Sequence, residues 1–315
     1  MVMESTLHVA VGVVRDIDGR ILLTQRAKHV HQGGLWEFPG GKLEPDETVL
    51  QALYRELREE VGIEVRTAKP LIKIKYRYPD LHVLLDVWTV AEYDGTATAH
   101  EGQAMCWVEP QQLAEYTFPS ANLPIISAAR LPDRYAILEG HNVEHVLHNL
   151  NKIIENKVSL LQLRVKSLPS ADVQAIYRVV QSECAQHNVK LLINSDLPLF
   201  DVKADGIHLS SRALMIARRR PENHDWVAAS CHNLKELRHA ENIGVDFVVL
   251  APILSTPTHP NMTPLGWENM TSLIEQVNIP VFALGGLRLD DIDRVVSAGG
   301  QGIAGISAFL EKTQS

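Results

Sequence analysis

The chain has 315 residues, of which 45% are apolar and 22% charged, and its formal net charge is −8. This composition excludes a disordered or collagen-like protein, and the acidic balance excludes binding of duplex nucleic acid through overall charge. The length predicts two domains. The three cysteines form no CxxC pair, so we expect neither a disulfide framework nor a zinc site. We expect a cytoplasmic protein that does not enter membranes, because the longest apolar run, 247–254, is too short to span one and the first residues lack a signal-peptide pattern.

The first 130 residues predict an α+β fold with a mixed sheet. Strand-like stretches follow one another across short turns, and one clear helix runs over 47–61 and ends at Gly62. The predicted strands are 7–14, 20–25, 71–78, 82–91 and 105–108. A segment rich in glycine and proline, 33–41, precedes the helix. Strands that outnumber helices in this way are typical of mixed-sheet domains.

After Pro132 short apolar strands alternate with helical stretches. The predicted strands are 135–138, 160–165, 190–194, 206–209, 227–231, 247–251, 281–284 and 302–305, each followed by a helix. Eight such units predict a compact α/β (β/α)8 TIM barrel. A dinucleotide-binding fold is the weaker alternative, because no GxGxxG opens a unit. We therefore expect two domains, 1–131 and 132–315.

Three carboxylates lie close together on the predicted helix 47–61. Glu56, Glu59 and Glu60 stand at positions i, i+3 and i+4, which are neighbours on a helix surface. Arg55 can reach Glu59 and offset part of their repulsion. The cluster is either a solvated charged face or a site for a hard divalent cation such as Mg²⁺, which prefers oxygen ligands.

The residues around this cluster distinguish the two interpretations. Residues 41–63 read G-KLEPD-E-TVLQALY-RELREEVGI and resemble the Nudix box, G-x5-E-x7-R-E-U-x-E-E-x-G-U with U apolar, at every specified position. The resemblance implies a hydrolase of nucleoside diphosphates linked to another group, with Mg²⁺ as cofactor and Mn²⁺ as a substitute. It implies metal ligands at Glu56, Glu59, Glu60 and the backbone of Gly40, with Arg55 orienting them and Glu47 in support.

Glu101 lies outside the box on a predicted loop. In Nudix enzymes a glutamate in such a loop often joins the metal site, whereas an isolated loop glutamate is usually only solvated. Either Glu56 or Glu101 is expected to act as the base that activates the attacking water.

Three further segments resemble the MutT-type enzymes of this family, which are 8-oxo-dGTP diphosphatases: TQRA at 24–27, LWEFPGGK at 35–42 and FPSAN at 118–122. The resemblance implies that Asn122 reads the oxidised base, since its amide both donates and accepts hydrogen bonds. The alternative is that Asn122 caps a helix over 123–129. The other implied substrate contacts are Arg26, His31, Phe38 and Asp80. Arg26 could instead be a surface cation, Phe38 a core residue and Asp80 a turn residue. Leu81 stands where a polar residue is expected.

Segments of residues 133–312 resemble thiamine phosphate synthase and its TenI-like relatives, among them LQLRVK at 161–166, ADGIHL at 204–209 and PVFALGG at 280–286. The resemblance implies a phosphate site at Gly285, Gly286, Ile306 and Ser307. Three departures predict a degenerate barrel. Ser195 replaces an aspartate and leaves Asp196 one residue away, pointing elsewhere; a second aspartate is missing around 211–213; and His259 replaces a lysine.

We therefore expect hydrolysis of 8-oxo-dGTP to 8-oxo-dGMP and pyrophosphate, which keeps the oxidised base out of DNA and so serves DNA repair and replication fidelity. The alternatives are hydrolysis of another diphosphate, such as a thiamine-related pyrophosphate, or a bifunctional enzyme with an active synthase. The barrel could also serve as a ligand sensor or a dimerisation module. The expected partners are the nucleotide and a phosphorylated thiamine-related ligand in the barrel, without stable binding of nucleic acid.

Overall fold

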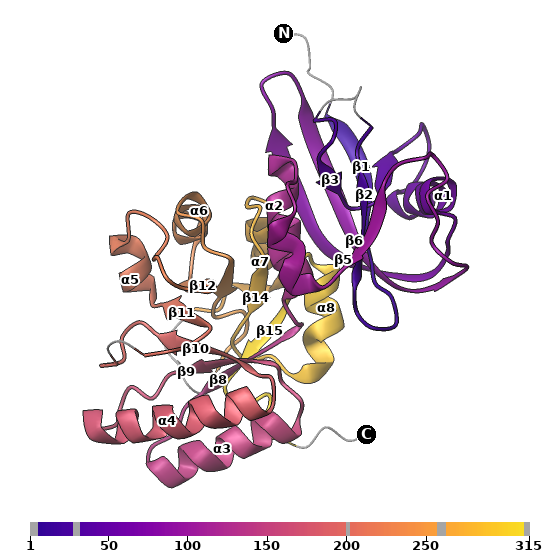
Figure 1. Cartoon of the computed structure of the whole chain (residues 1–315). Coiled ribbons are helices and arrows are strands. Elements are labelled where there is room, and N and C mark those ends of the chain that lie inside the picture. The colour runs from indigo at the N-terminus through magenta and orange to yellow at the C-terminus, as the bar shows by residue number, and fades with distance from the viewer. Residues whose placement is uncertain (1–5, 28–31, 200–201, 257–262, 312–315) are drawn as a thin grey trace. The chain divides into compact units, whose positions relative to one another are not determined.

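The structure is a computed structural model that describes residues 6–27, 32–199, 202–256 and 263–311 (Figure 1). The chain divides into two compact units, residues 1–131 and residues 132–315. Within the described ranges, no helix is both long enough and apolar enough to cross a bilayer.

The first unit combines two small sheets with two α-helices. One sheet has the strand order β4-β1-β6-β5 and the other β3-β2-β7. β1 pairs parallel with β6 and antiparallel with β4, which confirms the predicted mixed sheet. The elements are β1 (Leu7–Val14), β2 (Ile21–Gln25), β3 (Trp36–Glu37), β4 (Gly40–Lys42), α1 (Val49–Val61), β5 (Glu64–Arg77), β6 (His82–Asp94), β7 (Met105–Val108), the 3-10 helices η1 (Pro110–Glu115) and η2 (Ser120–Asn122), and α2 (Leu123–Arg130).

Alternation along β1 places a hydrophobic cluster on each face of the larger sheet. Val11 and Val13 belong to a cluster that includes Ile125 of α2, and Ala10 belongs to one that includes Leu57 of α1. Successive strand residues point to opposite faces, so α1 and α2 cover different sides of this sheet. The arrangement fixes α1, with its acidic residues, against the strands.

β3 and β4 lie in or at the end of the segment rich in glycine and proline and were not predicted, and α1 and β5 begin at other residues than expected. The helix begins at Val49 rather than residue 47, because Thr48 is its N-cap and closes a capping box with Gln51. β5 begins at Glu64 rather than residue 71. Its first half is largely polar and exposed and contains register shifts against β6, so the residue pattern there lacks the alternation by which strands are recognised.

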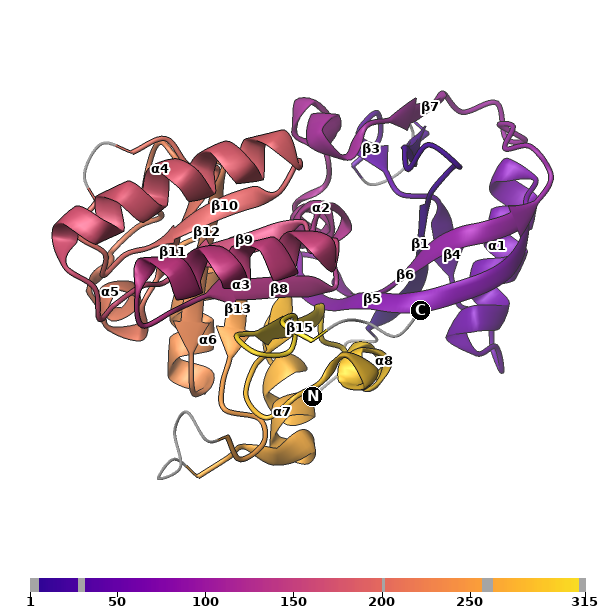
Figure 2. The same ribbon diagram turned by 90° about the horizontal axis from the view of Figure 1, so that it is seen from below.

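The second unit is a closed barrel of eight parallel strands in the order β10-β11-β12-β13-β14-β15-β8-β9, which confirms the predicted architecture (Figure 2). Its elements are β8 (Arg134–Leu138), α3 (Val143–Glu155), β9 (Leu160–Leu163), α4 (Ser170–Gln186), β10 (Lys190–Asn194), β11 (Gly206–Leu209), α5 (Ser211–Ile216), β12 (Trp226–Cys231), α6 (Leu234–Asn242), β13 (Phe247–Leu250), α7 (Gly266–Ile274), β14 (Val281–Ala283), η3 (Leu289–Asp291), α8 (Ile292–Ser297) and β15 (Gly302–Gly305). The expectation of a helix after every strand is wrong at two places: the described residues between β10 and β11, and those from 306 to 311, form none.

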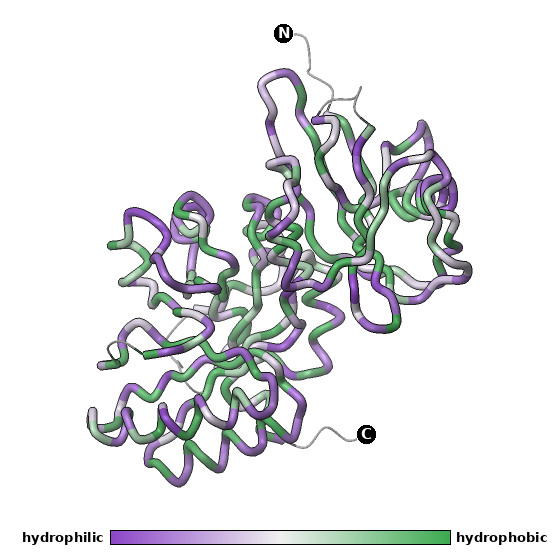
Figure 3. Tube along the Cα trace, in the orientation of Figure 1, coloured by the Kyte–Doolittle hydropathy of each residue, from purple (hydrophilic) through white to green (hydrophobic). Residues whose placement is uncertain are grey.

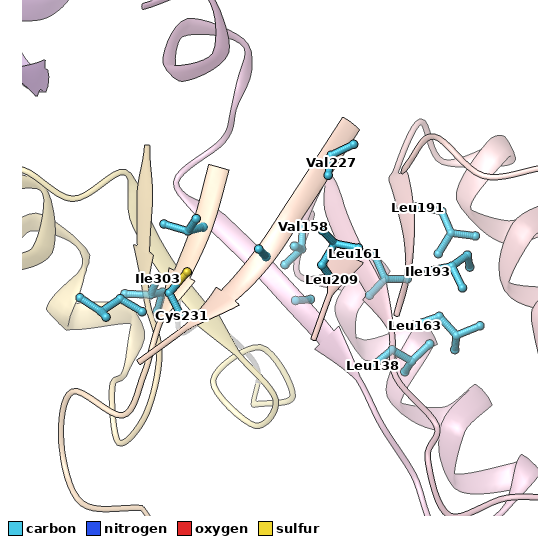
Figure 4. Close-up of a cluster of buried hydrophobic side chains, with 14 of the residues drawn as sticks. Leu138, Val158, Leu161, Leu163, Leu191, Ile193, Leu209, Val227, Cys231 and Ile303 are labelled. Atoms are coloured by element: carbon cyan, nitrogen blue, oxygen red, sulfur yellow. The ribbon is translucent and has the colours of Figure 1, made fainter. Parts of the chain in front are cut away.

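Side chains fill both sides of the barrel wall. Inside, the rings of Tyr135, Phe247 and Phe282 pack edge to face or tilted, with centroids 5.3–5.7 Å apart. Outside, apolar residues such as Leu163 and Ile193 pack with residues of the covering helices (Figure 4). These helices are amphipathic, as the alternating polar and apolar residues along α3 illustrate (Figure 3). The two layers make a packed core rather than a channel.

Candidate active site

α1 carries the acidic cluster on a firmly anchored helix. The capping box at Thr48 satisfies its first turn, and Gly62 ends it in the left-handed conformation with φ = 70°. The buried residues of α1 are Ala52, Leu53, Leu57 and Val61. Glu56 and Glu60 lie toward β4, whose Gly41 and Gly40 contact their carboxylates. The position of the site therefore follows from the packing of the helix.

Arg55 connects the carboxylates. Its Nε and Nη2 donate to the two carboxylate oxygens of Glu47 at 2.8 Å, and its Nη1 donates to Glu56 at 2.8 Å and to Glu59 at 3.4 Å. Hydrogen bonds from Arg55 lower the pKa of Glu47 to about 2. A bidentate guanidinium–carboxylate pair fixes both partners in direction as well as distance. Arg55 thus holds Glu56 in place, and Glu47 holds Arg55.

The glycine pair at β4 brings backbone against the same carboxylates. The backbone N–H of Gly40 donates to the carboxylate of Glu60 at 2.9 Å. Gly40 has φ = 146°, and a Cβ there would overlap the carbonyl oxygen of Ala10. A Cβ on Gly41 would overlap the carboxylate of Glu56. Only glycine allows both approaches at this place.

Negative charge accumulates around Glu60. Burial raises the pKa of Glu60, and the charges of Glu101 and Glu56 raise it further, against the hydrogen bond from Gly40. Glu59, by contrast, has a side chain that is 60% exposed. The structure therefore brings Glu56, Glu60 and Glu101 near one another and leaves Glu59 at the rim.

The donor set fits a hard divalent cation. Crowded carboxylates repel one another, and a cation relieves that repulsion while taking oxygen ligands. Among the described residues, no three His, Cys, Asp or Glu side chains stand close enough together to hold an ion as they are arranged. Here Arg55 and the N–H of Gly40 take up carboxylate oxygens of Glu56 and Glu60. Ligation would require these side chains to turn toward the ion.

A second group of predicted residues lies near the β2–β3 pair. Arg26 forms an ion pair with Glu37, which the sequence analysis did not single out. Burial raises the pKa of Glu37 to about 7, although Arg26 opposes the shift. The antiparallel register joins Thr24 to Glu37 and places the strand ends side by side. In the sequence, only the opposite charges of Arg26 and Glu37 in two nearby segments could have indicated this ion pair.

Asn122 is buried, with 8% of its surface exposed. It is the N-cap residue of α2, but its side chain makes no capping hydrogen bond. The capping alternative is therefore wrong. The preceding residue, Ala121, donates its backbone N–H to the hydroxyl of Tyr78 at 3.4 Å, and the charge of Arg26 acts on that same hydroxyl. Tyr78 thus links the surroundings of Arg26 and Asn122.

The remaining predicted contacts are placed as follows. Phe38 is 2% exposed and stacks on Phe118 with ring centroids 5.4 Å apart, so it lies in the core. Asp80 is exposed at the turn between β5 and β6. His31 lies outside the described residues.

The predicted phosphate site of the barrel lies where two neighbouring strands end. β14 and β15 pair in parallel, so the segments that follow them, with Gly285–Gly286 and Ile306–Ser307, emerge at the same end. Gly286 has φ = 67°, and a Cβ there would lie 2.6 Å from the carbonyl oxygen of Ser255. Ile306 also lines a cavity of about 460 Å³ together with Arg164 and Lys166.

Asp196 does not point away from this end of the barrel. Its carboxylate lies 3.2 Å from Nζ of Lys166 and accepts a hydrogen bond from the hydroxyl of Ser210 at 2.8 Å. The one-residue shift leaves Asp196 bonded to Lys166 and Ser210, and that it cannot replace the aspartate expected at position 195 stays a prediction. The predicted replacement of a lysine by His259 falls outside the described residues.

Comparison with known proteins identifies both units. Residues 10–128 match the NUDIX domain family, and residues 134–309 match the thiamine monophosphate synthase family. The first unit is similar to two Escherichia coli proteins: CTP pyrophosphohydrolase, at 42% identity over 38% of this chain and 87% of the relative, and 8-oxo-dGTP diphosphatase, at 40% identity over 38% and 94%.

The second unit is similar to thiamine-phosphate synthase of Syntrophomonas wolfei, at 31% identity over 56% of this chain and 84% of the relative. The NUDIX match includes the helix that carries Arg55 and its carboxylate partners, and the synthase match spans the closed barrel. The chain therefore belongs to two families, with an N-terminal Nudix hydrolase domain of the MutT type fused to a C-terminal thiamine monophosphate synthase domain.

Proposed function

We propose that the first unit hydrolyses a nucleoside triphosphate to the monophosphate and pyrophosphate, with 8-oxo-dGTP as its principal substrate and Mg²⁺ as its cofactor. The observation that carries the proposal is the cluster of Glu56, Glu60 and Glu101, held beside the Gly40–Gly41 backbone with Arg55 bound to Glu56. Cleavage of a phosphoanhydride needs charge compensation on phosphate oxygens and an activated water at the same place. Two of these carboxylates lie on α1 and the third on the loop between β6 and β7, and together they suit both needs.

The carboxylates would bind the cation and activate the attacking water. Glu56, Glu60, Glu101 and the backbone carbonyl of Gly40 would hold the divalent cation, with Glu59 at the exposed rim. When bound, that ion supplies charge neutralisation and lowers the pKa of an attached water. Glu56 or Glu101 would accept the proton of the attacking water.

The base would be read by residues around Asn122. Its side-chain amide makes no capping bond, so its donor and acceptor are available to a base edge. Arg26, held by Glu37, would contact the base or the phosphates. Asp80 and Phe38 complete the proposed contacts, and His31 belongs to the same proposal. Since one similar protein is a CTP pyrophosphohydrolase and another an 8-oxo-dGTP diphosphatase, a cytosine nucleotide is the main competing substrate.

Measured kcat/KM values test this assignment. With Mg²⁺ present and the products identified, 8-oxo-dGTP should be preferred over dGTP, CTP, thiamine pyrophosphate and ADP-ribose by about 100-fold, which corresponds to about 2.7 kcal/mol. A higher value for CTP would transfer the site to pyrimidine nucleotides. Turnover of thiamine pyrophosphate alone would mean that both domains serve one metabolite class.

For the barrel we propose binding of a phosphorylated thiamine-related ligand without synthase turnover. The specific observation is that the charge of Lys166 is already paired with Asp196, while the Gly285–Gly286 and Ile306–Ser307 segments remain side by side. Thiamine monophosphate should therefore raise the melting temperature of the full chain. Incubation with the pyrimidine pyrophosphate and thiazole phosphate substrates should yield no thiamine monophosphate. Measured synthesis would establish a bifunctional enzyme instead.

A further inference from the structure

The loop that carries Glu101 is attached to the C-terminal end of α1. The backbone N–H of Thr98 donates to the carbonyl oxygen of Val61 at 3.0 Å, and that of His100 donates to the carbonyl oxygen of Glu60 at 3.1 Å. The imidazole of His100 lies over Gly62, where a Cβ would come within 2.6 Å of the ring. These contacts use carbonyl groups that the helix leaves unpaired at its end.

Gln103 adds a side-chain bridge between the same two segments. Its Nε2 donates to the carbonyl oxygen of Glu60 at 3.1 Å, and its Oε1 accepts from the backbone N–H of Glu101 at 3.0 Å. One amide therefore spans the backbones of the two residues whose carboxylates face the proposed ion. A single planar group with a donor and an acceptor fixes that spacing more tightly than two independent contacts could.

The bridge opposes a physical tendency of the loop. The carboxylates of Glu60 and Glu101 repel each other, and Glu101 itself is exposed. Without the hydrogen bonds of Gln103, Glu101 would become ordered only when a cation binds, and the entropy lost in that ordering would weaken cation binding. Because the amide of Gln103 already orders the backbone of Glu101 in the folded protein, this entropy is not lost again when the cation binds.

We infer that Gln103 is a positioning residue, which holds the backbone of Glu101 beside that of Glu60 and so keeps the Glu101 carboxylate within reach of the proposed cation site. The inference rests on the proposed function of the first unit. A purely structural role for Gln103 would affect thermal stability, whereas a positioning role affects the affinity for the cation.

Mn²⁺ binding to the full chain, measured by titration calorimetry without substrate, separates these roles. Gln103→Met keeps the length of the side chain and removes both hydrogen bonds. We expect it to weaken Mn²⁺ binding by roughly 10-fold or more, the range found when partners of metal ligands are removed. The Mg²⁺ concentration for half-maximal hydrolysis should rise by a similar factor. Gln112→Met, at an exposed glutamine of η1, is the matched control and should change neither quantity.

The Mn²⁺ titrations can overturn either the inference alone or the proposed function as well. Mn²⁺ affinity in Gln103→Met equal to that of the unmodified chain would overturn the inference. Absence of Mn²⁺ binding to the unmodified chain would overturn the proposed function and the inference with it. If Gln103→Met lowers the melting temperature strongly, Gln103→Leu serves instead, because it also removes both hydrogen bonds and adds no charge. Weakened Mn²⁺ binding in a folded Gln103→Leu protein would support the inference, and unchanged binding would refute it.

Discussion

At the scale of single residues, the site depends on what each side chain is already bonded to. Arg55 is bonded to Glu47, Glu56 and Glu59, whereas the amide of Asn122 makes no capping bond to its own helix. The first arrangement fixes a cluster of carboxylates, and the second leaves a buried amide that its own helix does not use. Substitutions at these positions should therefore change different steps.

Glu56→Gln removes a carboxylate that faces Gly41 and is bonded to Arg55. The change keeps the size of the side chain and removes its charge, so kcat/KM should fall by about 10²–10⁴-fold for every nucleotide tested. Glu59→Gln is the control, and its smaller loss should reflect the 60% exposure of that side chain. Equal losses in the two variants would contradict the geometry described for the cluster.

Asn122→Ala should remove selectivity while sparing the chemical step. A site that hydrogen-bonds a base rejects its analogues because buried polar groups are left unpaired, so loss of the amide should lower the preference for 8-oxo-dGTP over dGTP by at least 10-fold. The melting temperature should change little, since the side chain makes no capping bond. The two kcat/KM values and a thermal unfolding curve measure this, and a preserved preference would move base recognition elsewhere.

His208 provides a pH-dependent test inside the barrel. Its Nδ1 lies 2.9 Å from the hydroxyl of Tyr135 and its Nε2 2.9 Å from that of Ser230. Burial lowers the pKa of His208 to about 3. Because the unfolded chain takes up a proton near pH 6.5 and the folded chain does not, stability should fall as the pH drops from about 6.5 toward 3, by up to about 1.4 kcal/mol per pH unit.

The control for this test is His208→Gln, which has no proton to take up. Urea unfolding of both full chains between pH 4.5 and 7.5 should show a steeper decline for the unmodified protein. Parallel stability curves for the two proteins would mean that His208 is protonated in the folded state.

At the scale of elements, apolar periodicity predicted most of the strands, and polar stretches concealed the rest. β1, β7, β10, β11 and β15 have the bounds expected from the sequence. In the polar first half of β5 only Val65 and Ala68 pack against the hydrophobic cluster that includes Leu57, which is too few residues to show an apolar face in the sequence. Side-chain partners across separate elements, such as Arg26 with Glu37, depend on strand register and could not be predicted from the sequence.

The N-cap of α1 controls the helix that carries the acidic residues. Thr48→Ala removes the acceptor for the backbone N–H of Gln51 and should cost about 1 kcal/mol of stability. We expect thermal unfolding of the first unit to occur a few degrees lower, with Mn²⁺ affinity nearly unchanged, since the acidic residues lie beyond the first turn. A large loss of Mn²⁺ affinity would mean that fraying of the helix start reaches the site.

At the scale of the whole molecule, two families contribute two separate cores. The eightfold alternation of strands and helices identified the barrel, because parallel strands require such crossovers. The chemistry of the barrel is harder to predict from sequence: Asp196, one residue from the expected place of an aspartate, lies 3.2 Å from Nζ of Lys166. The barrel could be predicted because its strand–helix pattern repeats, whereas the contacts of one side chain such as Asp196 depend on its exact position in a turn.

Separate cores predict separate responses to ligands. A ligand that binds only the folded form stabilises it by about 2.7 kcal/mol at 100 times its dissociation constant. In calorimetry of the full chain, Mn²⁺ with a non-hydrolysable nucleotide should raise one unfolding transition and thiamine monophosphate the other. A single transition raised by both ligands would show that the two units unfold as one.

The sheets of the two units differ in a way that bears on aggregation. The barrel is closed, so each of its strands is paired on both sides, whereas β5 forms an edge of the larger sheet of the first unit over 14 residues. A long open edge can recruit strands from other molecules. In β5 the exposed lysines at 69, 73 and 75, the proline at 70 and the register shifts are all features that discourage such pairing. Lys69 and Pro70, in the half of β5 that the sequence did not reveal, thus also disfavour pairing with a strand of another molecule.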